Sequence, residues 1–481
     1  MLSWLRSLFS GKAGPKPQGG GRGGGRVKGT YDAAAVTDEN ARHWRHTDAL
    51  SARRANSPAV RKILRERSRY ETDNNSYAQG ILQTIANNLV GSGPTLQVTW
   101  GSDEANRQIE GHWKLWSTAI RLADKLRVLA KSKKRDGEGV GLLITNPAVP
   151  GPVQLDLHLA EAEQMTTPFL SPIDPLSVDG ITFDDSGNPV TYHFLRYHPG
   201  DWAMAAHETR QVERRYVVHW FRCDRPGQVR GIPEFTPCLG LFQALRRFTL
   251  ATITAAETAA SFAAVLETTD GASRTDDGGA DEDFDAYDIE RGMMMRLPPG
   301  AKMNQFKGEH PGTTYEMFVW CLLREICRCL GVPLNVALGD SSKSNFSSAR
   351  LDHLVYWEGV DVEREDMARE VLEPVFAEWY REARLAGLLP EGTPADASAL
   401  PHRWEWPSRP VIDPKTEAES DEIRLRSGTA THAEIAGAQG RDWRERIRQR
   451  VMEEVYEAHV RDALGAPPKQ AATEGVPTNA A

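Results

Sequence analysis

Cysteine is scarce in this sequence, and no apolar run is long enough to cross a membrane. Only five of the 481 residues are cysteine, which is typical of proteins that remain in a reducing compartment. Cys321, Cys327 and Cys329 lie close together, but their spacing fits no zinc pattern and we interpret them as small packing residues. The apolar start at 1–6 is too short for a signal peptide. We therefore expect a protein that is made and kept in a cytoplasm until it is assembled, with no membrane partner.

The sequence also lacks an excess of basic residues. It contains 58 lysines and arginines against 66 aspartates and glutamates, which gives a formal net charge of −8. Proteins that hold nucleic acid tightly neutralise many phosphates and carry a basic face. This charge balance argues against a protein whose main task is tight binding of nucleic acid.

Motifs for catalysis are missing as well. The sequence contains no nucleotide-binding P-loop, no His-Glu-x-x-His and no Gly-x-Ser-x-Gly, and its glycine-rich stretch at 19–25 follows no strand. The histidines are scattered, and we interpret His219 and His353 as packing or surface residues rather than metal ligands. No set of residues supplies a nucleophile, a base and an orienting group. We therefore expect no enzyme activity, no catalytic residues, no metal and no cofactor.

Acidic residues are concentrated between Asp276 and Glu290, where there are eight aspartates and glutamates. The alternating Asp281, Asp283 and Asp285 resemble the start of a calcium-binding EF-hand loop. However, an alanine stands where that loop needs glycine, and a glycine stands where it needs the closing glutamate. We interpret the stretch as a solvated loop. The rival hypothesis is a nucleic-acid-processing metalloenzyme with these carboxylates as ligands, which would need them held convergently.

The middle of the sequence predicts two helices, an excursion between them, a polar loop and a third, very long helix. The first helix spans 236–265 and carries one apolar stripe at three- and four-residue steps. The second spans 314–330, and the long helical segment runs from 347 to about 387, with bends expected at Gly359 and Pro374. Small side chains let helices approach closely, so the first helix favours packing against copies of itself in a ring; the alternative is a core helix of an ordinary domain. The small residues assigned to this contact are Ala251, Ala255, Ala256, Ala259 and Ala260.

The first half of the chain adds strands to this helical pattern. Residues 1–30 are basic and glycine-rich, which is typical of a disordered arm. Helices are expected within 31–130 and strands within 138–222, including a hairpin turn at 184–189. The sequence therefore predicts an α+β fold that is predominantly helical.

The rest of the chain returns to helices. A hairpin is expected between 293–297 and 303–306, and Ser347 is expected to cap the long helix. A proline-rich connection at 388–411 then leads to helices within 415–464.

Four stretches of the sequence, taken in order, resemble one known family. They are 65–78 with 89–93, 219–222 with 225–233 and 262–264, 323–326 with 330–333, 339–340 and 345–350, and 412–415 with 417–418. Together they are similar to the lambda type of tailed-bacteriophage portal protein, and the resemblance runs from about Tyr31 to Val455. Two features depart from the family pattern: Phe346 stands where tyrosine is frequent, and the acidic stretch is an insertion.

The resemblance implies a portal-protein fold with wing, stem, clip and crown, in which the subunits form a ring around a central channel. Such a ring is usually dodecameric and lies at one capsid vertex. The implied parts are an arm (1–30), a helical then β-rich wing (31–235), a descending stem helix (236–265), a clip (266–312), an ascending stem helix (313–330), a tunnel loop (331–348), a long kinked wing helix with its connection (349–410), a helical crown (411–465) and a disordered tail (466–481).

The resemblance also implies partners and a location. Copies of the chain would form the ring, and double-stranded DNA would pass through it. The large subunit of terminase would dock during packaging, and head-completion or adaptor proteins would replace it later. Major capsid and scaffolding proteins would be neighbours, so the protein would lie in the virion at the capsid portal vertex, and in the host cytoplasm during assembly. The remaining alternative is a structural adaptor that forms no ring.

Two segments receive functional assignments in this scheme. The tunnel loop would meet DNA in the narrowest part of the channel through Asp340, Ser341, Ser342, Lys343, Ser344 and Asn345. The clip would hold terminase and adaptor through Asp276, Asp277, Asp281, Glu282, Asp283 and Asp285. Lys343 is the only basic residue of the loop, so a ring of net negative subunits would carry one sparse band of positive charge. Such a channel suits passage, because each lasting contact to a phosphate would hold sliding DNA back.

Overall fold

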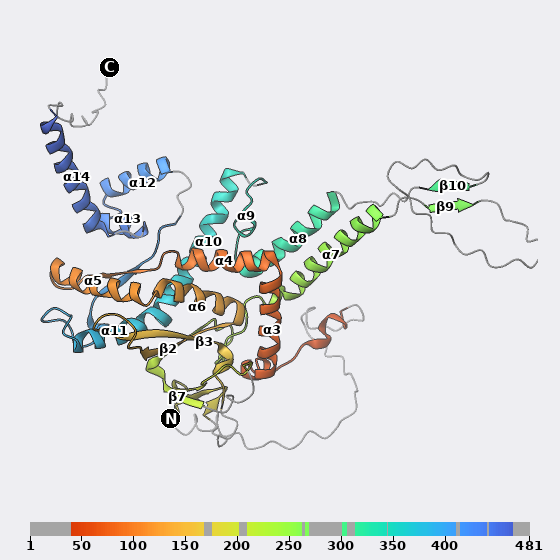
Figure 1. The fold of residues 1–481 in the computed structure, drawn as a ribbon, viewed down its shortest axis with the longest axis horizontal. Coiled ribbons are helices and arrows are strands. Elements are labelled where there is room, and N and C mark those ends of the chain that lie inside the picture. The colour runs from red at the N-terminus through yellow and green to blue at the C-terminus, as the bar shows by residue number, and fades with distance from the viewer. Residues whose placement is uncertain are drawn as a thin grey trace, which may run out of the picture.

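The computed structural model of this protein describes residues 40–167, 176–201, 209–261, 265–268, 301–304, 313–343, 345–409, 414–439 and 442–464. Helices predominate among them and short sheets lie between the helices (Figure 1), so the expected α+β, predominantly helical class is confirmed. The arm 1–30, the acidic stretch 276–290 and the tail 466–481 fall outside the described residues. What the sequence suggests for those three segments stays a prediction.

Helices make up the first part of the described chain. They are η2 (His43–His46), α2 (Ala52–Ala55), α3 (Pro58–Asn74), α4 (Ser76–Val90), α5 (Asp103–Ala119) and α6 (Leu122–Asp136). Asn75 separates α3 from α4, and its side chain accepts a hydrogen bond from the backbone N–H of Tyr77 (3.1 Å), which caps α4. Gly137, with a φ of 89°, ends α6 in the left-handed region. The expected helices are thereby confirmed, and the last continues beyond residue 130.

The described strands of the next part form two antiparallel sheets. They are β2 (Glu138–Thr145), β3 (Leu155–Ala160), β4 (Ser177–Val178), β5 (Ile181–Phe183), β6 (Pro189–Leu195), β7 (Thr209–Glu213) and β8 (Val217–Phe221), with short helical turns η3 (Ala162–Gln164) and η4 (Arg214–Tyr216). In one sheet β2 lies between β3 and β8; in the other the strands follow chain order from β4 to β7. The expected turn at 184–189 joins β5 to β6 and is confirmed.

One strand lies where only a connection was expected. In the segment 388–411, after the turn η7 (Ala397–Ala399), the chain forms β11 (His402–Glu405). This strand pairs antiparallel with β1 (Thr95–Val98), so that Val98 lies opposite His402. Four residues among prolines give little local signal, and the pairing depends on a partner far away in the sequence.

Two helices in the middle of the chain lead to a small two-stranded sheet. The elements are η5 (Thr236–Cys238), α7 (Leu239–Ser261), β9 (Val265–Thr268), β10 (Ala301–Asn304), α8 (Thr313–Leu330) and α9 (Leu334–Leu338). The expectation that the first helix reaches Val265 is wrong, because Val265 begins β9 and pairs with Asn304 of β10. The hairpin partner expected for Met303 was the segment 293–297, which lies outside the described residues; Met303 lies opposite Leu266 instead.

The long helix is continuous but changes its winding once. It consists of α10 (Phe346–Met367), a π-helical turn η6 (Ala368–Leu372) and α11 (Glu373–Leu385). The wider turn comes just before Pro374, which has no N–H to donate and whose ring crowds the preceding turn. Helix α10 runs through Gly359 without interruption, so no break occurs there.

Three further helices end the described chain: α12 (Pro414–Arg426), α13 (His432–Ala438) and α14 (Trp443–Ala463). The side chain of Thr431 accepts a hydrogen bond from the N–H of Glu434 (3.2 Å), and that of Asp442 accepts one from Arg444 (2.8 Å). These caps begin α13 and α14 close to where the sequence predicts them.

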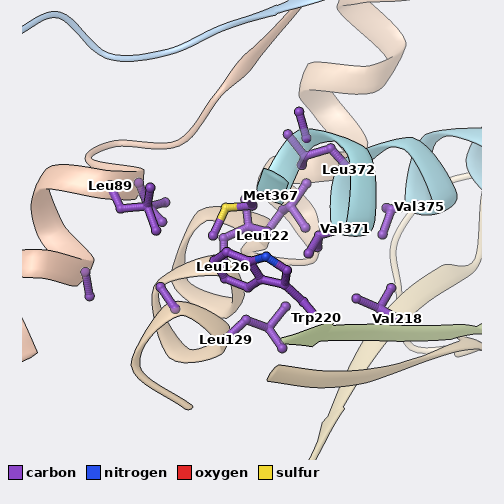
Figure 2. Close-up of a cluster of buried hydrophobic side chains, with 14 of the residues drawn as sticks. Leu89, Leu122, Leu126, Leu129, Val218, Trp220, Met367, Val371, Leu372 and Val375 are labelled. Carbon is purple, nitrogen blue, oxygen red and sulfur yellow. The ribbon is translucent and has the colours of Figure 1, made fainter. Parts of the chain in front are cut away.

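The core joins the first helices to the sheet and to the long helix. Trp220 of β8 is buried at its centre, and Figure 2 shows the indole beside Leu126 and Leu129 of α6, with Met367 and Val371 on the other side. A large buried aromatic side chain that contacts three elements stabilises their mutual arrangement. The sheet, α6 and the π-helical turn are thereby held together as one unit.

A buried carboxylate, Glu138, ties this unit to the segment that precedes α7. Its oxygens accept hydrogen bonds from Arg65 of α3 (2.9 Å), from Arg230 (2.8 Å) and from the backbone N–H of Gly231 (2.6 Å). Burial opposes ionisation of Glu138, but the Arg230 and Arg65 guanidiniums outweigh it and hold its pKa well below the usual range. A Cβ at position 231 would lie 2.0 Å from the carbonyl oxygen of Gly137, so only glycine allows this approach.

We predict that Glu138→Gln is severely destabilising. The substitution keeps the shape of the side chain but leaves two buried guanidiniums without their counter-charge, which costs about 3–5 kcal/mol. Urea unfolding of the folded subunit measures the loss. Glu66→Gln, on the exposed face of α3, is the matched control and should change stability by less than about 0.5 kcal/mol. Equal effects of the two substitutions would contradict this role for Glu138.

Candidate functional site

The helix pair α7 and α8 projects from the core and leads to β9 and β10 (Figure 1). Aromatic side chains hold the two helices together: Phe248 of α7 stacks on Tyr315 of α8, with ring centroids 5.4 Å apart, and lies 4.5 Å from Phe318. The Tyr315 hydroxyl also reaches Thr249 Oγ1 at 3.5 Å. The pair is therefore a stable projection rather than two independent segments.

The small residues assigned to a contact between subunits divide into three groups. Ala251 and Ala255 are exposed, and Ala256 is half-buried. The side chains of Ala259 and Ala260 lie outside the described part of the chain. Their interface role stays a prediction; in the isolated subunit, α7 does present exposed alanines one turn apart.

Two lysines and two glutamates fix the base of the helix pair. Lys134 of α6 donates to Glu234, just before α7, at 2.7 Å and to Glu363 of α10 at 2.9 Å. Lys133 lies 3.2 Å from Glu234 and also pairs with Glu363. The backbone N–H of Glu234 donates to the Lys134 carbonyl at 2.9 Å. The segment before α7, the end of α6 and the C-terminal part of α10 therefore meet in one charge cluster, which we call the stem-base cluster.

The electrostatics of the stem-base cluster favour its charged form. Burial opposes ionisation of Glu363, but Lys134 and Lys133 outweigh it and lower its pKa to about 2. Burial likewise opposes the charge on Lys134, and the two glutamates more than compensate, so its pKa is raised. Lys133 lies over the Trp220 ring, with Nζ 4.6 Å from the centroid. The cluster thus connects the charged groups to the hydrophobic core.

Arg364, next to Glu363, anchors α10 a second time. Its guanidinium donates to the carbonyls of Leu89 (3.0 Å) and Asn88 (3.1 Å), which are free carbonyls at the C-terminal end of α4. It also lies 5.4 Å from the ring of Trp357 and 5.4 Å from that of Trp406. The C-terminal half of α10 is therefore fixed to the core, whereas Leu351, Leu354 and Val355 in its N-terminal half are exposed.

The segment 331–348 is more structured than a loop. It contains the helix α9, which ends at Gly339 with a φ of 65°, and α10 begins within it at Phe346. The expectation that Ser347 caps the long helix is wrong: Asn345 caps it, accepting a hydrogen bond from the N–H of Ser348 at 2.8 Å. Of the residues assigned to contact with DNA, Ser344 falls outside the described residues.

Lys343, the only basic residue of the segment 331–348, is paired with a neighbouring helix. Its ammonium group pairs with Glu316 of α8 and lies 4.3 Å from the centroid of the Trp320 ring. Asp340 accepts a hydrogen bond from the N–H of Ser342 at 2.9 Å, and Ser341 and Ser342 are exposed. The tip of the segment is therefore connected to α8, because its one basic side chain bridges the two elements. Whether these residues line a channel stays a prediction.

Other residues considered at the sequence level are placed as follows. His219 is buried beside Glu138, and His353 hydrogen-bonds Asn335, so both pack as expected. Cys327 is buried, but Cys321 is exposed, so Cys321 does not pack inside the subunit as expected. The acidic residues assigned to the clip lie outside the described residues.

Two carboxylates and one imidazole lie close together at the surface, as the ligands of a metal ion would. Glu161, Glu163 and His198 place one ligand atom each within 4.8 Å of one another. Arg69 already pairs with Glu161 (3.3 Å) and Glu163 (2.9 Å). Since a guanidinium supplies the positive charge, the group is explained without a metal ion.

Sequence reasoning missed the stem-base cluster, although one signal was present. Leu122, Leu126, Leu129 and Lys133 follow each other at three- and four-residue steps on α6. A lysine that continues an apolar stripe indicates a buried, paired charge. The partners could not be named, because Glu234 and Glu363 are far away in the sequence.

Among the described helices, none is long and apolar enough to span a bilayer.

Comparison with known proteins gives matches along most of the chain. A family model described as phage portal protein, lambda family, matches residues 37–364. A protein of Halomonas phage phiHAP-1, named as a probable portal protein, is 24% identical over 412 residues, covering 79% of this chain and 78% of that protein. The fold is similar to one in the neck of a native GTA particle computed with C12 symmetry, with 14% identity, a TM-score of 0.44 and coverage of 86% of this chain and 95% of that chain. It is also similar to one in the virion of a native gene transfer agent particle, with 14% identity, a TM-score of 0.43 and coverage of 84% and 93%.

The stem-base cluster makes stability depend on pH. A carboxyl with a pKa of about 2 in the folded chain and 4.5 as its ordinary value contributes stability that is complete above pH 4.5 and is lost as the pH falls toward 2. We therefore predict that Glu363→Gln is less stable than the parent at neutral pH by roughly 3 kcal/mol. The difference should shrink as the pH falls through that window.

Urea unfolding at a series of pH values measures this difference. Glu391→Gln, at an exposed position in the connection after α11, is the control and should follow the parent at every pH. A stability difference between Glu363→Gln and the parent that stays constant from pH 7 to pH 2 would show that the ionised carboxylate is not what stabilises the base.

Proposed function

The chain belongs to the lambda family of phage portal proteins, and from this we propose that it assembles into a ring around a channel through which the viral genome is packaged and later ejected. The match of residues 37–364 to the family carries the proposal. The ring is proposed to be a dodecamer at the portal vertex of the capsid in the virion, built in the host cytoplasm. The chain acts as a structural conduit and not as an enzyme.

The parts of the ring are assigned from the order of the elements. We assign α7 and α8 to the stem, the region 266–312 with β9 and β10 to the clip, and 331–348 to the tunnel loop. Residues 31–235 and 349–410 form the wing, and 411–465 form the crown. Two observations support this: α7 and α8 project together from the core, and the chain between them forms a small sheet at their far end (Figure 1).

The charges of the subunit support a conduit rather than a clamp. The chain carries a formal net charge of −8, and the one basic residue of the segment 331–348 is already paired with Glu316. A ring of such subunits offers few fixed positive charges to phosphates, so DNA can slide without being held. The short side chains of the exposed Ser341 and Ser342 would form hydrogen bonds to phosphates that exchange readily with water.

The clip is the part that partners would reach. We propose that its acidic residues, from Asp276 to Asp285, dock the large subunit of terminase during packaging and head-completion or adaptor proteins afterwards. Major capsid and scaffolding proteins would contact the ring from outside. These partners follow from the family assignment and from the position of the clip between the two stem helices.

We predict that Ala255→Trp prevents ring assembly and leaves the subunit folded. Ala255 is exposed in the subunit, so a larger side chain meets no core. Between two stem helices it would overpack the contact, at about 1–3 kcal/mol per interface. Mass photometry measures assembly, and thermal melting checks the fold. Leu385→Trp, at a position 85% exposed on α11, is the control. If Ala255→Trp assembled as well as this control, α7 would not be the contact.

We predict that Lys343→Glu changes DNA translocation or retention more than Lys343→Ala does. Alanine removes the pair with Glu316, whereas glutamate places two carboxylates side by side and drives the loop tip away from α8. Ring assembly should be normal in both. Nuclease-protected DNA in a packaging assay is the readout, with Glu316→Gln as the control that breaks the same pair from α8. Packaging and retention equal to the parent in all three variants would remove the tip from the mechanism.

A further inference from the structure

Helix α8 has one exposed face that nothing in the described chain covers. Its members follow each other at steps of four, three and four residues, and this spacing places them along one side of the helix. They are Met317, Cys321, Arg324 and Arg328, all exposed. The opposite side of α8 carries the buried Val319, Leu323 and Ile326, so the exposed residues face away from the core. We call them the basic stripe.

Helix α10 carries a matching face of opposite charge. Its exposed residues follow the same steps, with one more at the end: Leu351, Val355, Glu358, Val362 and Glu365. Leu351, Val355 and Val362 are each more than 60% exposed. The buried Tyr356, Val360 and Arg364 lie on the other side of the helix. We call the exposed set the acidic stripe.

The charged members of both stripes form no ion pair in the described part of the chain. Arg324 lies over the Trp320 ring at 5.9 Å, and neither it nor Arg328 forms an ion pair there. The same holds within the described residues for Glu358 and Glu365. An apolar surface flanked by unpaired charges is typical of a surface that another protein covers.

We propose that the basic stripe of one subunit packs against the acidic stripe of the next subunit in the ring. The basic stripe spans eleven residue steps, about 16 Å of helix, and the acidic stripe spans fourteen, about 21 Å, so the acidic stripe is long enough to cover the basic one. Met317 and Cys321 would meet the aliphatic side chains, while Arg324 and Arg328 would meet Glu358 and Glu365. The inference rests on the proposed ring and names the surfaces that close it.

The geometry of a ring favours this pairing over contact between like stripes. A two-fold dimer uses the same patch on both subunits, whereas a closed ring of more than two subunits joins two different patches on each. Two basic stripes, or two acidic stripes, would repel each other. One chain that carries two stripes of opposite charge on different helices has what a head-to-tail contact requires.

Reversing the charges gives a direct test. In one variant, Arg324→Glu with Arg328→Glu, both stripes are acidic; in another, Glu358→Arg with Glu365→Arg, both are basic. Neither variant should assemble alone, since like charges then meet at every interface. The concentration needed for assembly should rise by roughly a hundredfold. Mixed together, the two variants should assemble, because alternating subunits restore an opposite pair at every contact.

Mass photometry and negative-stain imaging follow assembly, and native mass spectrometry of an isotope-labelled mixture gives the composition, which should be one to one. Arg350→Glu with Asp352→Arg reverses two exposed charges of α10 outside the stripe and should assemble like the parent. The proposal is wrong if either reversed variant forms rings alone at the parent's concentration, or if the mixture stays unassembled. If the unmodified protein forms rings but the variants behave in either of these ways, only the pairing of the two stripes is wrong and the proposed function stands. If the unmodified protein forms no rings, both the pairing and the proposed function are wrong.

Discussion

The stem-base cluster is the interaction on which the arrangement of the functional elements depends. Lys133 and Lys134 lie between Glu234 and Glu363, and these residues come from the end of α6, the segment before α7 and the C-terminal part of α10. Buried charges cannot separate without leaving a partner unpaired, which costs several kcal/mol. The helix pair α7 and α8 therefore cannot tilt at its base independently of the long helix, and a load on α7 is transmitted into α6 and α10. Arg364, bound to the end of α4, extends this connection to the first helices.

Rigid support at the base and exposed faces further out fit a subunit that is completed by its neighbours. One face of the first part of α7 and one face of the second half of α10 are buried against the core, while the alanines of α7 and much of the N-terminal half of α10 are exposed. For a channel, this division has a physical advantage. The surfaces proposed to contact other subunits would be held in fixed positions by the core, and the segment proposed for the tunnel is connected to α8 by the exposed pair of Lys343 with Glu316. Such a pair is weak enough to break when DNA passes.

Local patterns in the sequence predicted much of the fold but little of the site. The hairpin turn at 184–189 and the helices α13 and α14 are correct because capping and turn residues act over a few neighbours. The strand β11, the end of α7 and the stem-base cluster depend on partners far along the chain, which periodicity does not reveal. The short helix α9 was missed because five residues beside a proline and a glycine carry no period. Resemblance at four separate stretches, rather than any motif for chemistry, pointed to the family.

The central claim is that copies of this chain close into a ring around a channel, and imaging of the purified full-length protein tests it most directly. Single-particle electron microscopy with averaging over end-on views would show both the number of subunits and the hole. We expect a closed ring of identical subunits with a central opening and with α7 and α8 running beside it. Finding instead a monodisperse monomer, or a two-fold dimer without an opening, would contradict the proposal that the chain forms a ring.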